Sequence, residues 1–250
     1  MEESWIKFFQ SGVYAEGWTW RVDEDKTRRE VDAVLNFLKP PAGAHILDWC
    51  GGWGRHAIEL ARRGYEVTLL DFAENHIQMA EEASKKAGVA LKLVHSDFRY
   101  TPSNIGADYA INMFTAGIGY LSEEDDFAAL RSLHTALKPG ARFLLDTMNL
   151  FWLVRNYNPN GWHEIVEGKV RILETREFDL LTHRNRSKGI LWRKGKKDRT
   201  YVLDHRVYTA CELAKILKAA DFGHVASYGD FDGQLLTMSS PRLILISESL

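Results

Sequence analysis

Residues 45–54, HILDWCGGWG, decide the fold of this 250-residue chain. The first five residues form a short apolar run that predicts a buried strand. The glycines at 51, 52 and 54 predict a sharp turn that lets a ligand approach the backbone closely. A helix is expected next, from about Arg55 to Arg63, and it ends at Gly64. Strand, glycine loop and helix in this order are typical of nucleotide-binding α/β domains.

Strand and helix patterns alternate on both sides of this stretch. Upstream, Thr27 and Glu30 predict a capping box that opens a helix ending at Pro40. Downstream, Ser122 with Asp125 predicts another helix start. Further strands are expected at 65–71, 89–95, 107–113 and 141–149, with a helix at 74–87. Regular alternation of this kind predicts a mostly parallel sheet with helices on both faces.

The pattern changes after residue 150. Residues 155–208 are β-rich, charged and interrupted by glycines, which predicts antiparallel hairpins inserted into the parallel scaffold. Thr209 and Glu212 then predict a capping box, followed by strands at 223–229 and 242–247. We therefore expect a Rossmann-like, mostly parallel seven-stranded sheet plus an inserted antiparallel β subdomain. The expected single domain, 1–250, divides into an N-terminal lid segment (1–26), a cofactor-binding core (27–150), the insertion (155–208) and the end of the core (209–250).

The composition excludes several classes of protein. The formal net charge of −2 argues against a protein built to coat nucleic acid. Two distant cysteines, Cys50 and Cys211, do not indicate a disulfide framework, and the acidic N-terminus lacks a signal-peptide pattern. No apolar run approaches the roughly 18 residues that a membrane span needs. The histidines show no metal-ligand spacing, so we expect no metal. From the cysteines and the lack of a long apolar run we expect a cytoplasmic protein without a membrane partner.

Three carboxylates lie where strands hand over to loops. Asp71 ends the second strand, where it can accept hydrogen bonds from the hydroxyls of a ribose. Gly52, Gly54 and Ala57 match the dinucleotide fingerprint G-x-G-x-x-A, so NAD stays open as a cofactor at this point. Asp48 suits a cationic amino-acid tail better than a pyrophosphate. Asp97, after the third strand, can accept from an adenine amino group.

The motifs resemble those of the class I S-adenosylmethionine-dependent methyltransferases, in particular the small-molecule type. The similar stretches are ILDWCGGWGRHAIELARRGYEV (46–67), LLDFAENHIQMA (69–80), VHSDFRY (94–100) and LHTALKPGARFLLD (133–146). The resemblance covers roughly residues 27–150, and the ending, TACELAKILKAADFGHVASYGDFDGQ (209–234) with SPRLILIS (240–247), also resembles the tail of small-molecule members of the family. The tryptophans at 49 and 53 depart from the smaller, less aromatic loop that is usual in the family.

The resemblance implies a role for each of these residues. Asp48 with Gly51, Gly52 and Gly54 would hold the methionine end of S-adenosylmethionine, and Asp71 would bind the ribose. Phe72 would lie against the adenine, while Asp97 and the backbone of Phe98 would contact its edge. Asn112, at the end of the fourth strand, is assigned to the cofactor as well.

A small-molecule methyl acceptor is expected at the ends of strands four and five. We expect it to contact Thr115, Tyr120 and Asn149, with His163 from the insertion. Asn112, Phe114 and Asp146 are further candidates at these strand ends, and Tyr228 and Asp230 are weaker ones. The aromatic N-terminus is either core packing or a lid over the substrate; its expected substrate contacts are Tyr14 and Trp18. No catalytic base is identified, because methyl transfer needs one only if the acceptor must lose a proton first.

Several functions remain open. The favoured one is methyl transfer to a nitrogen or oxygen of a small molecule, by a monomer or homodimer. The basic run at 184–199 allows an RNA methyltransferase, although a solvated hairpin edge explains the same residues, and nucleic acid is not the favoured partner. The glycine loop and Asp71 also allow an NAD-dependent oxidoreductase or a non-catalytic subunit that binds S-adenosylmethionine.

Overall fold

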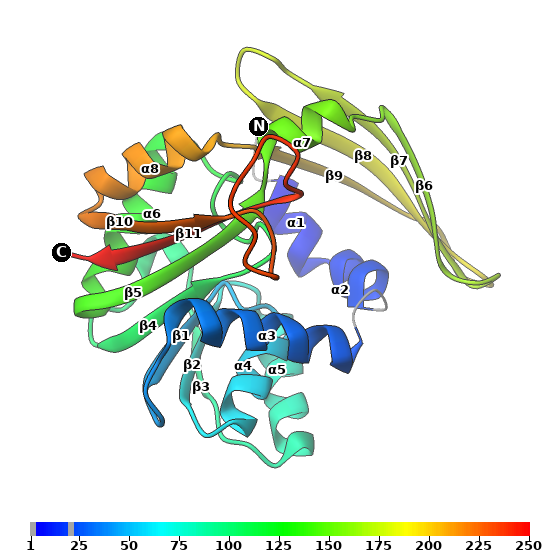
Figure 1. Cartoon of the computed structure of the whole chain (residues 1–250). Helices are drawn as coiled ribbons and strands as arrows, with labels where there is room; N and C mark the ends of the chain where they lie inside the picture. Colours follow the sequence, from blue (N-terminus) through cyan, green and yellow to red (C-terminus); the bar gives the residue numbers. More distant parts are fainter. Residues whose placement is uncertain (1–3, 20–22) are drawn as a thin grey trace.

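The computed structural model describes residues 4–19 and 23–250, and it is built on a seven-stranded sheet of order β10-β11-β5-β4-β1-β2-β3 (Figure 1). Strands β3, β2, β1, β4 and β5 are parallel, whereas β11 is antiparallel to both β5 and β10. This confirms the Rossmann-like fold class. The strands are β1 (His45–Trp49), β2 (Glu66–Asp71), β3 (Lys92–His95), β4 (Ala107–Asn112), β5 (Leu137–Met148), β10 (Phe222–Tyr228) and β11 (Arg242–Ser249).

Helices cover both faces of this sheet because neighbouring strand residues point to opposite sides. Leu47 faces α6 and α8, whereas the adjacent Ile46 faces α3 and α4. Both side chains are fully buried. The helices of the main body are α3 (Glu24–Leu38), α4 (Arg55–Arg62), α5 (Glu74–Ala87), the short 3-10 helix η2 (Phe98–Tyr100), α6 (Glu123–Thr135), α7 (Leu150–Arg155) and α8 (Ala210–Ala219). No described helix has the length and apolar content to cross a membrane.

Two of the three expected helix caps are confirmed. The Ser122 side chain accepts the backbone N–H of Asp125, and Thr209 with Glu212 forms a complete capping box. The box expected at Thr27 is wrong, because α3 begins one turn earlier and is capped by Asp23. Thr27 and Glu30 instead lie inside α3, where both accept hydrogen bonds from Arg55.

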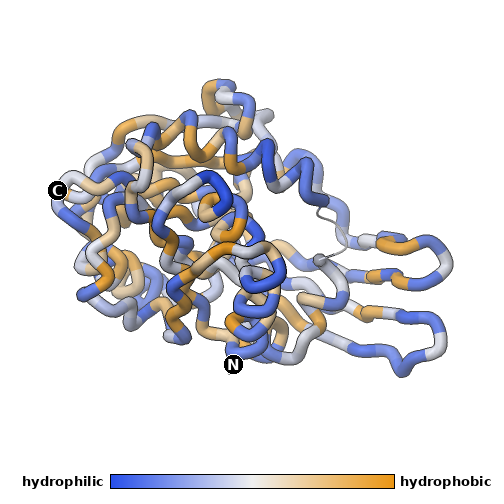
Figure 2. The backbone as a smooth tube through the Cα atoms, turned by 90° about the horizontal axis from the view of Figure 1, so that it is seen from below, coloured by the Kyte–Doolittle hydropathy of each residue, from blue (hydrophilic) through white to orange (hydrophobic). Residues whose placement is uncertain are grey.

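The insertion forms a separate four-stranded antiparallel sheet of order β6-β7-β8-β9. Its hairpins extend away from the main body (Figure 2). Gly189 in β8 leaves room for the ring of Tyr201 opposite, since a Cβ atom there would lie 2.1 Å from the ring. The strands are β6 (Asn160–Val166), β7 (Val170–Phe178), β8 (Arg184–Arg193) and β9 (Arg199–Arg206).

The N-terminal helices α1 (Ser4–Gln10) and α2 (Val13–Trp18) join the inserted sheet to the main body. Phe8 packs with Ile172, Leu191 and Tyr201 of the inserted sheet, whereas Trp5 lies in the main core. Of the expected lid, residues 1–3 and 20–22, including Trp20, lie outside the described residues. The segment after residue 23 belongs to α3, so it does not extend the lid.

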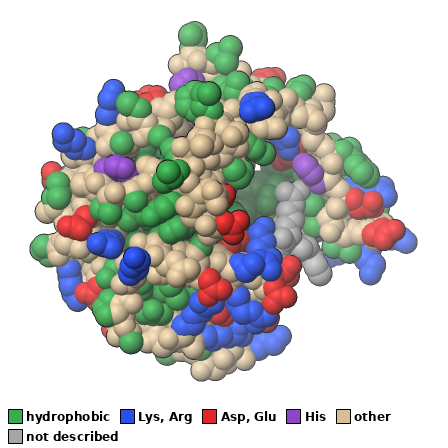
Figure 3. Space-filling view, in the orientation of Figure 1, with side chains coloured by type: hydrophobic (Ala, Val, Ile, Leu, Met, Phe, Trp, Pro, Cys, Tyr) green, Lys and Arg blue, Asp and Glu red, His purple; other side chains and the backbone are tan. Residues whose placement is uncertain are grey.

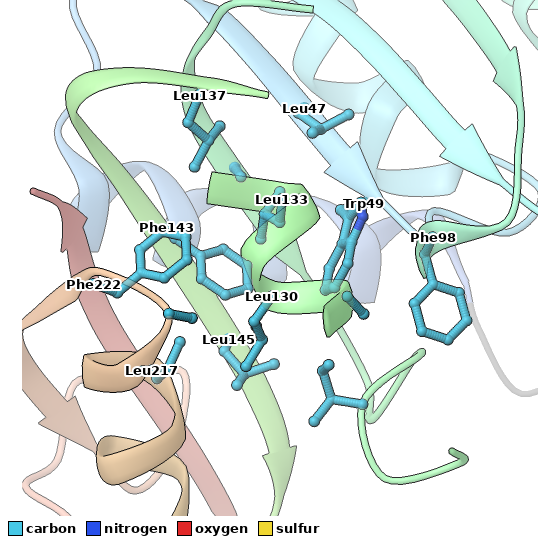
Figure 4. Close-up of a cluster of buried hydrophobic side chains, with 14 of the residues drawn as sticks. Leu47, Trp49, Phe98, Leu130, Leu133, Leu137, Phe143, Leu145, Leu217 and Phe222 are labelled. Carbon is cyan, nitrogen blue, oxygen red and sulfur yellow. The ribbon is translucent and has the colours of Figure 1, made fainter. Parts of the chain in front are cut away.

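Substitution of Phe143, a residue of β5, tests the hydrophobic core on one face of the sheet. Its fully buried ring lies 5.6 Å from that of Phe222 and 6.2 Å from that of Trp49 (Figure 4). Phe143→Ala should lower the free energy of unfolding by about 3–5 kcal/mol, because it removes buried area and leaves a cavity. Phe151 is 52% exposed, so Phe151→Ala should change it by less than about 0.5 kcal/mol. Urea titration measures both, and equal losses would contradict this core.

Candidate active site

The site lies where the strand order reverses. Strand β1 has β2 on one side and β4 on the other, so the loops after β1 and β4 leave the sheet in opposite directions and open a crevice between them. A cavity of about 470 Å³ occupies this edge. In the space-filling view, a hollow lined by hydrophobic side chains separates the main body from the inserted sheet (Figure 3).

Four groups of residues line the cavity. The N-terminal helices and the start of α3 contribute Trp5, Phe8, Phe9, Tyr14, Trp18 and Lys26. The loops after β1 and β2 contribute Asp48, Cys50, Gly51, Gly52, Trp53, Arg55, His56, Asp71, Phe72 and His76. Phe98, Met113, Phe114, Thr115, Ala116, Gly117 and Tyr120 follow β3 and β4. Met148, Leu203, His205 and Arg242 complete the wall.

Asp48 places an incompletely paired carboxylate in the cavity. It is 1% exposed, and within the described chain its Oδ2 atom has no hydrogen-bond partner. Burial raises the pKa of Asp48 to about 7, although the nearby Arg55 and the backbone N–H of Ala57 act in the opposite direction. A Cβ atom on Gly51 would lie 2.7 Å from this carboxylate. Glycine at 51 therefore lets the loop pass close to Asp48.

Asp71 holds the glycine loop in place. Its Oδ2 accepts the backbone N–H of Gly52 at 2.9 Å, and its Oδ1 accepts that of Ala73 at 2.9 Å. The ring of His76 lies 3.2 Å from Oδ1. Asp71 thus ties the loop after β1 to the start of α5 and still borders the cavity, because a carboxylate oxygen can accept more than one hydrogen bond.

Aromatic rings border Asp71 on the side of β3. Phe72 and Phe98 both line the cavity, and Trp5 contacts their rings at centroid distances of 4.7 and 5.8 Å. Asp97 does not line the cavity; its side chain caps η2 and pairs with Arg99 at 2.6 Å. The predicted contact of Asp97 with adenine therefore stays a prediction.

The loop after β4 is held in a strained conformation. Phe114 and Thr115 have φ angles of 61° and 59°, a left-handed region that non-glycine residues rarely adopt. Asp146 stabilises both, because its carboxylate accepts the N–H of Phe114 at 2.8 Å and its carbonyl accepts that of Thr115 at 3.0 Å. Met148 donates its N–H to the Thr115 hydroxyl at 3.1 Å. Such conformations cluster at ligand sites.

Cations surround the ring of Phe114. Arg55, Arg242 and Lys26 lie 4.7, 5.3 and 5.7 Å from its centroid. Arg55 pairs with Glu30, and Arg242 makes two hydrogen bonds to the buried Asp146. Three cations thus face two carboxylates, so this wall favours an anionic group.

His56 stacks on the ring of Phe114 and adds no further charge to this wall. Burial lowers the pKa of His56 to about 4, so its imidazole is neutral near pH 7.

The N-terminal aromatic residues pack in the two cores and also border the cavity, while their role as a lid over a substrate stays a prediction. Trp5 and Phe8 are buried in the two cores, whereas Phe9, Tyr14 and Trp18 border the cavity as partly buried side chains. Burial raises the pKa of Tyr14 to about 12, so its hydroxyl stays protonated. Its ring lies 5.4 Å from that of Trp53.

Several predicted site residues do not line the cavity. Asn112 is fully buried and donates to the carbonyl of Trp49, while Gly54 caps α4 and packs on Leu69 and Ala80. Asn149 caps α7 and holds the segment before β11 through Thr237 and Ser240. His163 lies in β6 beside Arg176.

The two weaker candidates, Tyr228 and Asp230, make local contacts. Tyr228 stacks on Phe37, and Asp230 accepts from backbone N–H groups of its own turn. Because none of these predicted site residues lines the cavity, the contacts expected of them with the cofactor or the acceptor stay predictions.

Sequence reasoning missed six polar residues of the wall, namely Lys26, Arg55, His56, His76, His205 and Arg242. Arg55 follows the glycine loop directly, so its place beside the motif is a signal that could have identified it. Arg242 and His205 lie in a late strand and in the insertion, where no motif marks them. Cys50 also lines the cavity as a partly buried free thiol, and desolvation raises its pKa well above the ordinary value, so the thiolate form is disfavoured.

A family model described as a methyltransferase domain matches residues 46–140. Residues 46–140 are therefore a class I S-adenosylmethionine-dependent methyltransferase domain. This match decides between the two nucleotide cofactors considered above, because S-adenosylmethionine is the cofactor of these proteins.

Curated relatives share this methyltransferase domain. An S-adenosyl-L-methionine-dependent Diels-Alderase of Talaromyces variabilis is 31% identical over 54% of this chain and 47% of its own. A glycine/sarcosine N-methyltransferase of Halorhodospira halochloris is 28% identical over 54% and 52%. A tRNA 5-carboxymethoxyuridine methyltransferase of Escherichia coli is 25% identical over 66% and 62%. The chain spans about half the length of the first two.

Solved structures match this chain over nearly its whole length. The CcbJ methyltransferase of Streptomyces caelestis has a TM-score of 0.81 at 18% identity and covers 96% of both chains. The amino pentose methyltransferase CalS10 of Micromonospora echinaspora, solved with S-adenosylmethionine, has a TM-score of 0.71 at 18% identity and covers 95% of this chain and 97% of its own. At these identities the likeness establishes the fold.

The cavity fits S-adenosylmethionine. The unpaired, buried Oδ2 of Asp48 suits the ammonium of the methionine end, and the cations around Phe114 suit its carboxylate. Asp71 can accept from ribose hydroxyls, and Phe72 and Phe98 offer apolar contact to a base. The donors and acceptors present therefore match an amino acid joined to a nucleoside.

The pKa of Asp48 predicts a pH-dependent affinity. Below pH 7 the carboxyl is protonated in the free protein and must lose its proton to pair with an ammonium. The affinity for S-adenosylhomocysteine should therefore rise about tenfold from pH 6 to pH 8 and then level off. Asp48→Asn should bind weakly with a flat profile. Calorimetry at several pH values checks this, and a flat profile for the wild type would contradict it.

Replacement of Asp71 should lower the affinity for S-adenosylhomocysteine independently of pH. Asp71→Ala removes charge-assisted hydrogen bonds worth about 1.5–3 kcal/mol each, so the affinity for S-adenosylhomocysteine should fall by at least about tenfold. The control is Asp108→Ala, which removes a carboxylate from the opposite end of β4 that pairs with Lys138. An Asp71 variant that is folded and binds like this control would exclude the role.

Proposed function

We propose that this protein transfers a methyl group from S-adenosylmethionine to a nitrogen or oxygen of a small molecule held in the cavity. The observation that carries the proposal is the way the cavity is closed. Leu203 and His205 of the inserted sheet, and Phe9 and Trp18 of the N-terminal helices, line it together with the glycine loop. A walled site of this size suits a small ligand, because such ligands bind with most of their surface buried.

Comparison with relatives supports the same class of acceptor. One relative is a glycine/sarcosine N-methyltransferase and one structural neighbour is an amino pentose methyltransferase. The relative named as a Diels-Alderase depends on S-adenosylmethionine but carries a different reaction in its name. Binding of the cofactor alone therefore does not identify the reaction, and direct assay for methyl transfer is needed.

The protein contributes to methyl transfer mainly by positioning the cofactor and the acceptor and by excluding water. When bound, S-adenosylmethionine supplies a methyl group that its sulfonium activates for attack. Asp48 and Asp71 fix the two ends of the cofactor, and the loop at Phe114 and Thr115 borders the space where an acceptor atom would lie. The aromatic walls keep this space apolar, so a neutral nucleophile stays desolvated and in line.

RNA is the second candidate acceptor, since a tRNA methyltransferase is among the relatives. The basic run at 184–199 supports it only weakly. Arg184 and Arg186 pair with Asp204, and Arg193 and Arg199 pair with Glu16 of α2. Four of its cations are thus used within the fold, whereas phosphate binding needs cations that face solvent.

A labelled-methyl assay tests the proposal. The protein is incubated with methyl-labelled S-adenosylmethionine and, separately, small amines, phenols, amino sugars and total tRNA. We expect label in a small amine or hydroxyl compound. Label only in tRNA, or binding of S-adenosylhomocysteine without transfer to any acceptor, would overturn the proposal.

A matched pair of variants on β9 tests whether the acceptor occupies the cavity. Leu203 lines the cavity, whereas its neighbour Val202 is 41% exposed on the other face of the sheet. Leu203→Trp should fill the acceptor space and lower turnover at least about tenfold, with S-adenosylhomocysteine affinity changed less than about threefold. Val202→Trp should change neither quantity. Equal turnover of the two variants would place the acceptor elsewhere.

A further inference from the structure

His205 is a buried polar residue in the wall that the inserted sheet contributes. It lies on β9 two positions after Leu203, so both side chains point to the same face of the strand. Both line the cavity, and His205 is only 6% exposed. A histidine at this position borders the cavity from the inserted sheet, whereas the glycine loop after β1 borders it from the main body.

Neither ring nitrogen of His205 has a hydrogen-bond partner among the described residues. Leaving a buried donor or acceptor unpaired costs about 1–3 kcal/mol, so a histidine that served packing alone would be a poor choice here. Burial lowers the pKa of His205 to about 4 against the smaller opposing effect of Asp204. Near pH 7 the imidazole therefore offers one N–H donor and one acceptor nitrogen.

The surroundings of His205 are apolar or already paired, with the exception of Asn185. The ring of Tyr120 lies 5.6 Å away, and burial keeps the phenol protonated by raising its pKa. Asn185 lies directly opposite on β8 and also has an unpaired Oδ1. The nearest charges, Asp204 and Arg184, bond to each other at 2.8 Å. The groups at this end of the cavity that can still form a hydrogen bond are therefore uncharged.

We propose that His205 binds the methyl acceptor through a hydrogen bond from an N–H or O–H group of that molecule to its unpaired ring nitrogen. The inference rests on the proposed function and names the class of acceptor: an uncharged amine or hydroxyl compound with an apolar or aromatic body. The hydrogen bond fixes the nucleophilic atom at the wall that the inserted sheet contributes, and the aromatic side chains hold the rest of the molecule.

The test compares three probes of similar shape on the protein loaded with S-adenosylhomocysteine. Phenol and aniline carry an O–H or N–H donor, whereas toluene does not. Calorimetry or ligand-observed NMR gives the three affinities for the wild type, for His205→Leu and for His205→Gln. His224→Gln is the control, since His224 is exposed on β10 and remote from the cavity wall.

In the wild type and in the His224→Gln control, phenol and aniline should bind about fivefold more tightly than toluene, the value of one hydrogen bond. His205→Leu should abolish this preference while leaving the affinity for toluene and for S-adenosylhomocysteine unchanged. His205→Gln should restore part of it, because the amide oxygen accepts hydrogen bonds.

Two results would overturn the assignment of His205. One is the absence of a preference for phenol and aniline over toluene in the wild type. The other is a preference that survives in His205→Leu. Both measurements are independent of methyl transfer, so they separate this proposal from the labelled-methyl assay.

Discussion

The pairing of β1 with β2 on one side and β4 on the other is the constraint on which the site depends. It places the glycine loop, Asp71 and the loop at Phe114 on one edge of the sheet although they are far apart in sequence. The carboxylate of Asp71 then connects the glycine loop to α5. The cofactor side is therefore part of the sheet edge, and it needs no additional domain to form.

The cofactor side of the fold could be predicted because its signals are local. An apolar run, three glycines and a terminal carboxylate occupy adjacent positions, and the side chains of Asp48 and Asp71 reach the cavity as the motif implies. Asp97 shows the limit of this reasoning. Its position in the chain agrees with the family pattern, yet its side chain turns to Arg99, a rotamer choice that no motif encodes.

The acceptor side could not be predicted in the same way. His205 and Arg242 reach the cavity through the packing of the inserted sheet and through the antiparallel pairing of β11 with β5. Asn149 and His163 have the right residue types in expected places, but backbone carbonyls and a neighbouring arginine engage them. Long-range packing decides which polar residues face a cavity, and periodicity within one segment carries no information about it.

The ion pairs of Glu16 with Arg193 and Arg199 join segments about 180 positions apart in the chain. Contacts at such separation form late, because loop closure must come before them. During synthesis, α1 and α2 leave the ribosome long before β8 and β9 exist. Phe8 is then without the inserted sheet that later buries it, so this ring stays exposed until β7, β8 and β9 have been made.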